Sequence, residues 1–456
     1  MKRVTINAFF SGDATSFLLS IAGLLVITSF FLSAGDVYSV TMNKCIRPDG
    51  QVIFTDQPCP SHTFSSLIEN KHSTQESSSA TKNNQDEVPI SLREEAKKIY
   101  ISTAQQNNSH KISPRLIGGA IQAGGLNLQN LVTTIAGVPM VTGSADGTSR
   151  RALFNWPYGI TSDGANLYVA DYTNRCIRKI VIATGVVTTL AGKPRSIGSA
   201  DGVGAEAAFR FIQGITTDGT NLYVTDVGNH NIRKIVISTG VVTTLAGSAE
   251  NPGKADGIGT AATFNYPWGI TTDGVNLYVT DDNNATIRQI EISTGVVTTL
   301  AGTVGFTGHT DGTGTTASFY NPYGITTDGT NLYVADSYNN AIRKIVISSG
   351  VVSTLAGMVG KYGNTDGVGT AATFYRPSGI TTDGTNLYVA DNWNSTIRKI
   401  VIATGIVSTL AGKAMIKGHD DGMGAAATLN SPFGITTDGK NLYVADTVNA
   451  TIRKIQ

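Results

Sequence analysis

Hydrophobic and polar residues alternate in four short segments between residues 214 and 247. The segments are GITTD (214–218), NLYVTD (221–226), NIRKIVIS (231–238) and VVTTLAG (241–247), and they are separated by Asp-Gly, a polar turn and Thr-Gly. A period of two indicates a half-buried β-strand, and Asp-Gly between two such segments is a strong hairpin signal. The pattern therefore predicts four antiparallel strands, which form one blade of a β-propeller.

This pattern recurs six times from residue 131 onward, with a fixed period of 55 residues and no insertion. The Asp that closes NLYVAD or NLYVTD stands at Asp171, Asp226, Asp281, Asp336, Asp391 and Asp446. A second Asp, in the loop sequence DGxG, follows the same period, although the first copy has Ser149 in place of the second Gly and the last copy begins with the doubled Asp420-Asp421. A fixed period of this length is the signature of a repeat architecture.

The two ends of the repeat array predict that it closes into a ring. A strand LVTTIAG begins at Leu131, before the first complete unit, whereas the last unit stops at Gln456 without its fourth strand. If Leu131–Ala136 lies beside 451–456, it completes the sixth blade and removes two exposed sheet edges. An open solenoid is the alternative, but it would leave both ends uncapped. We therefore expect an all-β fold, a six-bladed β-propeller over residues 131–456.

The recurring phrases VTTLAG, DGxGxxAxF, PxGI, NLYVAD and NxxIRKI resemble the NHL repeat family, in six copies that cover residues 131–456. The resemblance implies a six-bladed propeller, in agreement with the closure argument. It leaves function open, because members of this family bind proteins or RNA or act as metal-dependent lyases, and related propellers hydrolyse lactones.

The first 34 residues predict a signal peptide or membrane anchor. Lys2 and Arg3 precede the uncharged apolar run 17–34, and Leu32-Ser33-Ala34 is an acceptable cleavage site. The run is also just long enough to span a membrane if it is not cleaved. Under either interpretation the rest of the chain is exported, to the periplasm or the extracellular space.

Residues 35–60 predict a small hairpin domain. In an oxidising compartment Cys45 and Cys59 should form a disulfide around the turn Asp49-Gly50. Together with Phe54-Thr55-Asp56 and the closing Pro58-Cys59-Pro60, this segment resembles a small domain of unknown function found near the N-terminus of proteobacterial envelope proteins. Residues 61–118 are rich in Ser, Asn, Gln and Lys and predict a flexible linker, with one possible short helix at 91–105.

Composition excludes several classes of protein. With 41% hydrophobic and 15% charged residues, the chain is neither a disordered protein nor a coiled coil. Its 34 Lys and Arg balance 33 Asp and Glu, so no basic surface suggests a nucleic-acid partner. The 51 Gly residues fit a fold with many tight turns.

Two motifs that recur in every unit predict structural roles. The pattern Asp-x-x-Asn-x-x-Ile-Arg, such as Asp171, Asn174 and Arg178, is present in all six units, whereas an active site needs one constellation. The DGxG loops resemble a calcium loop or a nucleotide-binding loop only superficially, since each offers about one carboxylate and calcium takes six to eight oxygen ligands. We expect these loops to form turns, we predict no cofactor or metal, and a structural calcium ion is the remaining alternative.

No catalytic pattern stands out in the propeller. HExxH, GxSxG and CxxC are absent from the sequence, and the propeller's histidines are His230, His309 and His419. Zinc lyases of the NHL type need several inward-facing His ligands, which this set does not suggest. Cys176 is expected to be a small buried residue.

Variation between units is concentrated in two segments, the one before each PxGI strand and the one after each NLYVAD strand. In an up-and-down blade both segments lie on the same face, and all three Trp of the chain fall in them. The residues that we expect to bind a ligand there are Trp156, Tyr158, Arg210, Phe211, Tyr266, Trp268, Tyr320, Tyr323, Tyr338, Tyr375, Arg376, Trp393 and Phe433.

Aromatic rings with Asn and Arg between them suit a protein, a peptide or a glycan. The sequence thus favours an exported, non-enzymatic binding module with an envelope partner, and with membrane contact only through an uncleaved N-terminal segment. One alternative is a metal-dependent lyase or lactonase-like hydrolase with a site in the central channel. Another is a purely structural surface repeat, in which the aromatic residues pack between blades or plug the ring.

Overall fold

The computed structural model describes residues 125–456 and, nearer the N-terminus, five backbone strands: β1 (Val4–Asn7), β2 (Phe17–Ile21), β3 (Leu24–Thr28), β4 (Ser39–Ile46) and β5 (Val52–Thr55). The chain divides into two compact units, Met1–Ile101 and Ser102–Gln456. No helix in the described part of the chain is long and apolar enough to cross a membrane.

In the N-terminal unit, β4 pairs antiparallel with β1 and β5, and β2 pairs with β3. Cys45 lies opposite Ile53 in the β4–β5 pair. Cys59 lies outside the described residues, so the Cys45–Cys59 disulfide stays a prediction. The linker 61–118 and its short helix also lie outside the described residues. Of the signal segment 1–34, the structure describes only β1, β2 and β3, so the signal also stays a prediction.

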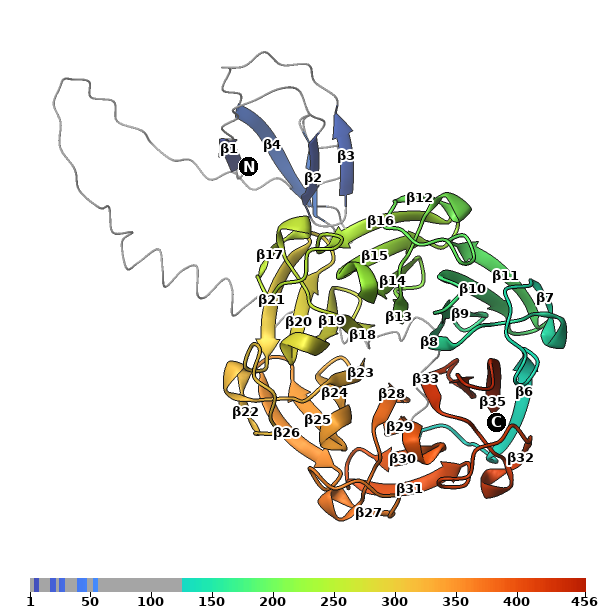
Figure 1. Cartoon of the computed structure of the whole chain (residues 1–456). Helices are drawn as coiled ribbons and strands as arrows, with labels where there is room; N and C mark the ends of the chain where they lie inside the picture. Colours follow the sequence, from blue (N-terminus) through green and yellow to red (C-terminus); the bar gives the residue numbers. More distant parts are fainter. Residues whose placement is uncertain (1–3, 8–16, 22–23, 29–38, 47–51, 56–124) are drawn as a thin grey trace, which may run out of the picture. The chain divides into compact units, whose positions relative to one another are not determined.

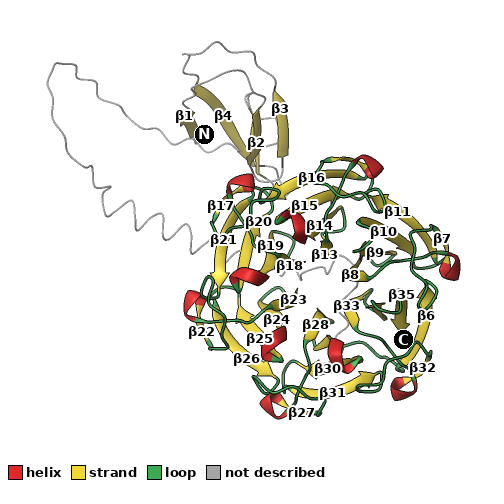
Figure 2. Cartoon of the chain, viewed as in Figure 1, coloured by secondary structure: helices red, strands yellow, loops and turns green. Residues whose placement is uncertain are grey.

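The second unit is a propeller of six five-stranded sheets, arranged around a central axis (Figures 1 and 2). We number these blades 1 to 6 in chain order. The innermost strands are β8 (Pro157–Ser162), β13 (Ile212–Thr217), β18 (Pro267–Thr272), β23 (Pro322–Thr327), β28 (Pro377–Thr382) and β33 (Pro432–Thr437). The second strands are β9 (Asn166–Asp171), β14 (Asn221–Asp226), β19 (Asn276–Asp281), β24 (Asn331–Asp336), β29 (Asn386–Asp391) and β34 (Leu442–Asp446).

The third strands are β10 (Cys176–Val181), β15 (Asn231–Val236), β20 (Thr286–Glu291), β25 (Ala341–Val346), β30 (Thr396–Val401) and β35 (Thr451–Ile455). The fourth strands are β11 (Val186–Ala191), β16 (Val241–Ala246), β21 (Val296–Ala301), β26 (Val351–Ala356), β31 (Ile406–Ala411) and, in blade 6, β6 (Leu131–Ala136). These four positions in the blade are the ones that the alternating pattern predicted.

The structure adds a fifth, two-residue strand at the outer edge of each blade, which the sequence analysis interpreted as loop. These strands are β7 (Gly147–Thr148), β12 (Gly202–Val203), β17 (Gly257–Ile258), β22 (Gly312–Thr313), β27 (Gly367–Val368) and β32 (Gly422–Met423). They belong to the DGxG segments and pair with the fourth strands, so the Gly-rich sequence concealed an extended pair of residues.

Short 3-10 helices occupy two places in the blades (Figure 2). One set follows the outer strands: η1 (Ser149–Arg151), η2 (Gly204–Glu206), η4 (Gly259–Ala261), η6 (Gly314–Thr316), η8 (Gly369–Ala371) and η10 (Gly424–Ala426). The other set lies between the second and third strands: η3 (Val227–Asn229), η5 (Asp282–Asn284), η7 (Ser337–Asn339) and η9 (Asn392–Asn394).

The ring closes as the sequence predicted. Strand β6 lies between β32 and β35, and the sixth sheet has the order β32-β6-β35-β34-β33. In the β6–β35 pair, Ile452 is opposite Ala136 and Ile455 is opposite Val132. The first propeller strand along the chain therefore completes the last blade, and no sheet edge is left at the junction.

The hydrophobic core lies between neighbouring blades. Between blades 1 and 2, for example, Tyr168 and Ile177 pack with Phe209 and Leu222, and all four are buried. Near the axis the blades come so close that a Cβ on Gly324 would overlap the carbonyl oxygen of Ser378 in the next blade. A Gly at this place in each innermost strand therefore permits the close approach that forms the channel wall.

A buried ion-pair network unites the two recurring motifs within each blade. In blade 1, Arg178 is buried, and its Nη1 and Nη2 atoms pair with Asp171 Oδ2 (2.9 Å) and Asp146 Oδ1 (2.8 Å). Asn174 Nδ2 donates to Asp171 Oδ2 (2.8 Å), and the guanidinium lies over the ring of Phe154 (5.1 Å). The same pairs recur in the other five blades, at Arg233, Arg288, Arg343, Arg398 and Arg453. This confirms the structural interpretation of the Asp-x-x-Asn-x-x-Ile-Arg motif, and the Asp of each DGxG segment joins the same network.

Candidate ligand-binding face

The two variable segments of each blade lie against each other at one end of the propeller. The backbone N–H of Tyr172 donates to the carbonyl oxygen of Trp156 (3.3 Å). In blade 2 the N–H of Val227 donates to the carbonyl oxygen of Phe211 (2.8 Å). The segments that enter the innermost strands and the turns that follow the second strands thus form one surface, as the sequence predicted. We call this surface the aromatic face.

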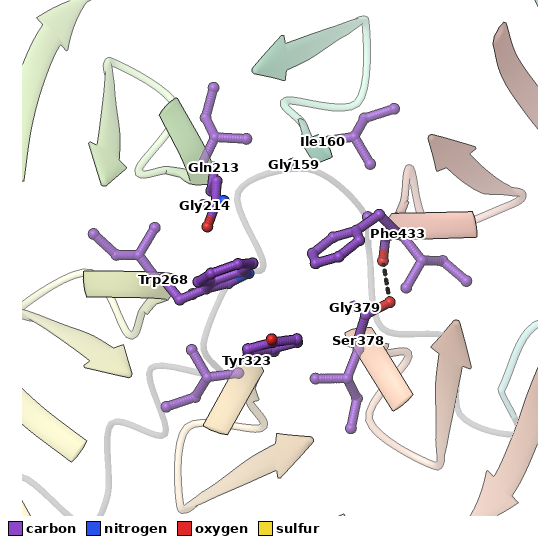
Figure 3. Close-up of a pocket in the computed structure, with 17 residues that line it drawn as sticks. Gly159, Ile160, Gln213, Gly214, Trp268, Tyr323, Ser378, Gly379 and Phe433 are labelled. Carbon is purple, nitrogen blue, oxygen red and sulfur yellow. Dashed lines mark hydrogen bonds between the residues drawn. The ribbon is translucent and has the colours of Figure 1, made fainter. Parts of the chain in front are cut away.

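The central channel opens on this face. One side chain from each blade surrounds its mouth, that of the residue before the Gly of the innermost strand. Three of these side chains, Trp268, Tyr323 and Phe433, point toward the axis in Figure 3. With the Gly-Ile pairs below, the channel side chains line a cavity of about 70 Å³. The six mouth residues are Tyr158, Gln213, Trp268, Tyr323, Ser378 and Phe433.

Aromatic rings fill most of the mouth. Trp268 and Tyr323 are stacked, with ring centroids 4.3 Å apart and an interplanar angle of 8°. Phe433 lies 4.3 Å from Tyr158 and about 6 Å from both rings of the stacked pair, at 6.0 and 6.1 Å. Four rings from four blades therefore meet over the axis, and they narrow the entrance to the channel.

Further rings extend this cluster outward across the face. On one side Tyr172 lies between Tyr158 (4.7 Å) and Phe211 (5.2 Å). On the other side Tyr338 lies 6.2 Å from Tyr323, centroid to centroid.

Beyond Tyr338, the guanidinium of Arg376 is held between two aromatic rings. It lies 4.0 Å from the centroid of Tyr338 and 4.4 Å from that of Trp393. Tyr375 packs on Trp393 at 5.0 Å and Tyr320 on Tyr338 at 5.1 Å, while on the opposite side Trp156 lies 6.5 Å from Tyr158. All the residues expected to bind a ligand, except Arg210 and Tyr266, thus belong to one continuous network.

None of the thirteen expected residues is buried. Trp156, Tyr266, Tyr320 and Trp393 are the most exposed, at 44%, 43%, 40% and 46%, and the other nine are half-buried. Arg210 forms only a long ion pair with Glu250 (3.4 Å), and Tyr266 packs edge-on against His230 (4.8 Å). The rings partly plug the channel, as one alternative expected, but each keeps access to solvent.

The sequence analysis missed several polar residues of the face, namely Gln213, Ser378, Asp282 and Ser337. Aligning the six units at the residue before each Gly-Ile and at the residue after each NLYVAD would have found them, because the side chain differs between the units at both positions. Asp282 is the most unusual of the four. Its carboxylate is buried, with 5% of the residue exposed, and its Oδ1 accepts a hydrogen bond from Asn321 Nδ2 (2.9 Å).

Burial perturbs the titration of several groups on this face. It raises the pKa of Asp282 to about 7. The hydrogen bond from Asn321 lowers this pKa, and the charge of the neighbouring Asp281 raises it. Burial, together with the Asp282 carboxylate, raises the pKa of Tyr323 far above its ordinary value. Burial also raises the pKa of Tyr158 to about 12. Both phenols are therefore neutral near pH 7, whereas Asp282 titrates there.

The histidines and the cysteine of the propeller have other surroundings. His230 is buried, its Nδ1 accepts the N–H of Tyr266 (3.1 Å), and burial followed by the charge of Arg210 lowers its pKa. Cys176 is buried, and burial raises the pKa of its thiol well beyond the usual range. His309 and His419 are exposed. Within the residues that the structure describes, no three His, Cys, Asp or Glu side chains group as metal ligands.

No protein-family model matches the chain. Among curated proteins, it is 33% identical over 277 residues to Protein SUPPRESSOR OF QUENCHING 1, chloroplastic, of Arabidopsis thaliana, covering 57% of this chain and 26% of that protein. It is 30% identical over 305 residues to NHL repeat-containing protein 2 of Gallus gallus, covering 59% of this chain and 42% of that protein. The chain thus spans less than half the length of these relatives.

Two solved propellers from Bacteroides thetaiotaomicron share the fold. One is a protein of unknown function, with a TM-score of 0.54, 23% identity, and coverage of 71% of this chain and 75% of that one. The other is an auxiliary nutrient binding protein, with a TM-score of 0.55, 18% identity, and coverage of 72% and 76%. The chain is a six-bladed β-propeller, and the NHL proteins among its relatives support the resemblance of its recurring phrases to the NHL-repeat propeller family.

Proposed function

We propose that this protein is an exported, non-enzymatic binding module that holds a protein, a peptide or a glycan on the aromatic face of its propeller. One observation carries the proposal: the side chains that differ between the six units join into one solvent-accessible aromatic network on a single face. Aromatic side chains supply large contact areas at low cost in conformational entropy, and they are enriched where proteins bind partners.

The rest of the propeller supports a rigid scaffold beneath this face. Each blade has the same buried Arg–Asp network, and β6 ties the last blade to the first. A scaffold held in this way loses little conformational freedom when a ligand binds, which favours affinity. An auxiliary nutrient binding protein has the same fold, so the fold accommodates a binding role.

The test is a binding screen with the full chain. Peptide pools and envelope glycans are titrated while tryptophan fluorescence is recorded, since every Trp of the protein lies on the aromatic face. We expect a saturable change that Trp156→Ala and Trp393→Ala weaken. Phe306→Ala is the control, because Phe306 is 61% exposed and lies outside the aromatic network. Binding that survives both Trp replacements would refute a role for this face.

Export is the second part of the proposal. It rests on Lys2, Arg3 and the uncharged run 17–34, which have the order of charge and apolarity of an export signal. Residues 35–60, with the Cys45–Cys59 disulfide, and the linker 61–118 would then tether the propeller in the periplasm or outside the cell. Fusing residues 1–34 to alkaline phosphatase tests this, since that enzyme becomes active only after export, and an inactive, stable fusion would contradict it.

A further inference from the structure

The polar side chains around the channel mouth are hydrogen-bonded in blades 5 and 6. Asn392 Nδ2 donates to the carbonyl oxygen of Pro432 (2.9 Å), and Thr447 Oγ1 donates to that of Pro157 (2.7 Å). Ser378 Oγ donates to the carbonyl oxygen of Phe433 (3.0 Å). Each of these bonds joins one blade to the next, so these three side chains are hydrogen-bonded without a ligand.

Three side chains in blades 2 to 4 lack such bonds. Gln213 Oε1, Trp268 Nε1 and Ser337 Oγ are buried and have no hydrogen-bond partner among the described residues. Asp282 has the one bond from Asn321, and no Lys, Arg or His of residues 125–456 pairs with its carboxylate. A buried polar group without a partner destabilises the fold, so three such groups, together with a buried carboxylate that has one hydrogen bond and no cation, call for a ligand.

These four groups match the hydroxyl groups of a sugar. Trp268 Nε1–H is a donor, Gln213 Oε1 and the Asp282 carboxylate are acceptors, and the Ser337 hydroxyl is both. A hydroxyl group can donate to one of them and accept from another at the same time. Tyr266 and Tyr320, on blades 3 and 4, expose 43% and 40% of their surface on the same side and offer rings to the C–H groups of a sugar.

We propose that the blade 2 to 4 side of the channel mouth is a subsite for a neutral sugar residue, with hydroxyl groups paired to Gln213, Trp268 and Asp282. This proposal rests on the proposed binding function and names its ligand class. The cavity of about 70 Å³ is several times the ~10–15 Å³ that one water molecule needs, so it admits a hydroxyl or hydroxymethyl group while the sugar ring stays above.

A basic peptide is the competing ligand, because a buried carboxylate beside aromatic rings also attracts a cation. Arg376 argues against it. Its guanidinium, stacked on Tyr338, puts a positive charge on the adjoining blade, and no acidic side chain among the described residues pairs with it. The mouth thus carries both signs of charge and several neutral polar groups, which suits an uncharged ligand rich in hydroxyl groups.

The full chain is titrated with short neutral oligosaccharides of glucose, mannose, galactose and xylose, and with a basic peptide pool, by isothermal titration calorimetry. We expect saturable binding of at least one oligosaccharide. Asp282→Asn and Trp268→Phe should each weaken it by about tenfold or more, since the first turns one acceptor oxygen into an amide donor and the second removes the indole N–H donor. Glu206→Gln is the control for Asp282→Asn and Phe306→Ala is the control for Trp268→Phe, because both residues are exposed and lie outside the aromatic network.

The possible negative results separate the two proposals. If only the peptide pool binds, and Trp268→Phe weakens it, the sugar subsite is wrong and the binding function stands. If an oligosaccharide binds equally well to the Asp282→Asn and Trp268→Phe variants, the subsite is in the wrong place. If no ligand binds the aromatic face, both proposals are wrong. Gln213→Ala provides a second variant should Asp282→Asn fail to fold.

Discussion

Replacing Asp282 with Asn tests whether the fold holds this buried carboxylate at a cost in stability. The pKa of Asp282 is about 7 in the folded protein and 3.8 in its ordinary state. Between these two values the folded state binds one proton more than the unfolded state, so stability decreases as the pH rises through this window. Above pH 7 the decrease is complete, because Asp282 is then charged in both states.

The size of the effect follows from the two pKa values. A rise from 3.8 to about 7 corresponds to about 4 kcal/mol, at 1.36 kcal/mol for each pKa unit. Asn cannot ionise, and its amide oxygen can still accept the hydrogen bond from Asn321. We therefore expect the stability of Asp282→Asn relative to the natural protein to be about 3 kcal/mol greater at about pH 8 than at about pH 5.

Urea unfolding followed by circular dichroism at the two pH values measures this difference. Glu206→Gln is the control, because Glu206 is exposed and its replacement removes the same charge. The buried carboxylates of the other five blades titrate alike in the two proteins and cancel in the comparison. An advantage of Asp282→Asn that is the same at both pH values, or a loss of stability at the higher one, would refute the reasoning.

Three further predictions concern the scaffold. Asp281→Ala leaves the buried Arg288 with the half-exposed Asp256 as its one carboxylate partner. It should lower the free energy of unfolding in urea by about 3–5 kcal/mol, and a decrease below about 1 kcal/mol would contradict the structural role of the network. Deleting Leu131–Ala136 exposes the edges of β35 and β32, so the variant should aggregate, which light scattering measures. A stable monomer would contradict closure by β6. Cys176 should react with a thiol reagent only after denaturation, because it is buried with a raised pKa, and fast labelling of the native protein would disprove this.

The fold could be predicted almost completely from the sequence because each unit repeats the same local signals. Period-two segments and Asp-Gly turns gave the four main strands, and the displaced strand 131–136 gave the closure. The two-residue strands, such as β12, could not be found, because Gly202–Val203 has no pattern long enough to show a period. The shortness of these strands therefore limited this part of the prediction.

The candidate site was predicted only in part. Aromatic residues that vary between units pointed to the correct face, since the variable segments adjoin in every blade. Asp282 and Gln213 were not singled out, because an isolated Asp or Gln in a turn ordinarily interacts with solvent. Their importance arises from burial, which depends on the neighbouring blade. Asn321 of blade 4, for example, donates to the buried Asp282 of blade 3.

The closure by β6 also determines where the propeller bears mechanical load. Both ends of the ring meet in blade 6, where the N–H groups of Gln129 and Leu131 donate to the carbonyl oxygen of Gln456 (3.0 and 3.2 Å). Leu126 and Leu128 pack against the core between blades 5 and 6, and the N–H of Leu126 donates to Asp383 Oδ2 of blade 5 (2.8 Å). A pull on the chain before residue 125 is therefore resisted by this clasp alone. We expect stretching between the two ends in an optical trap to detach β6 first and open the ring there, and a first rupture in another blade would contradict this.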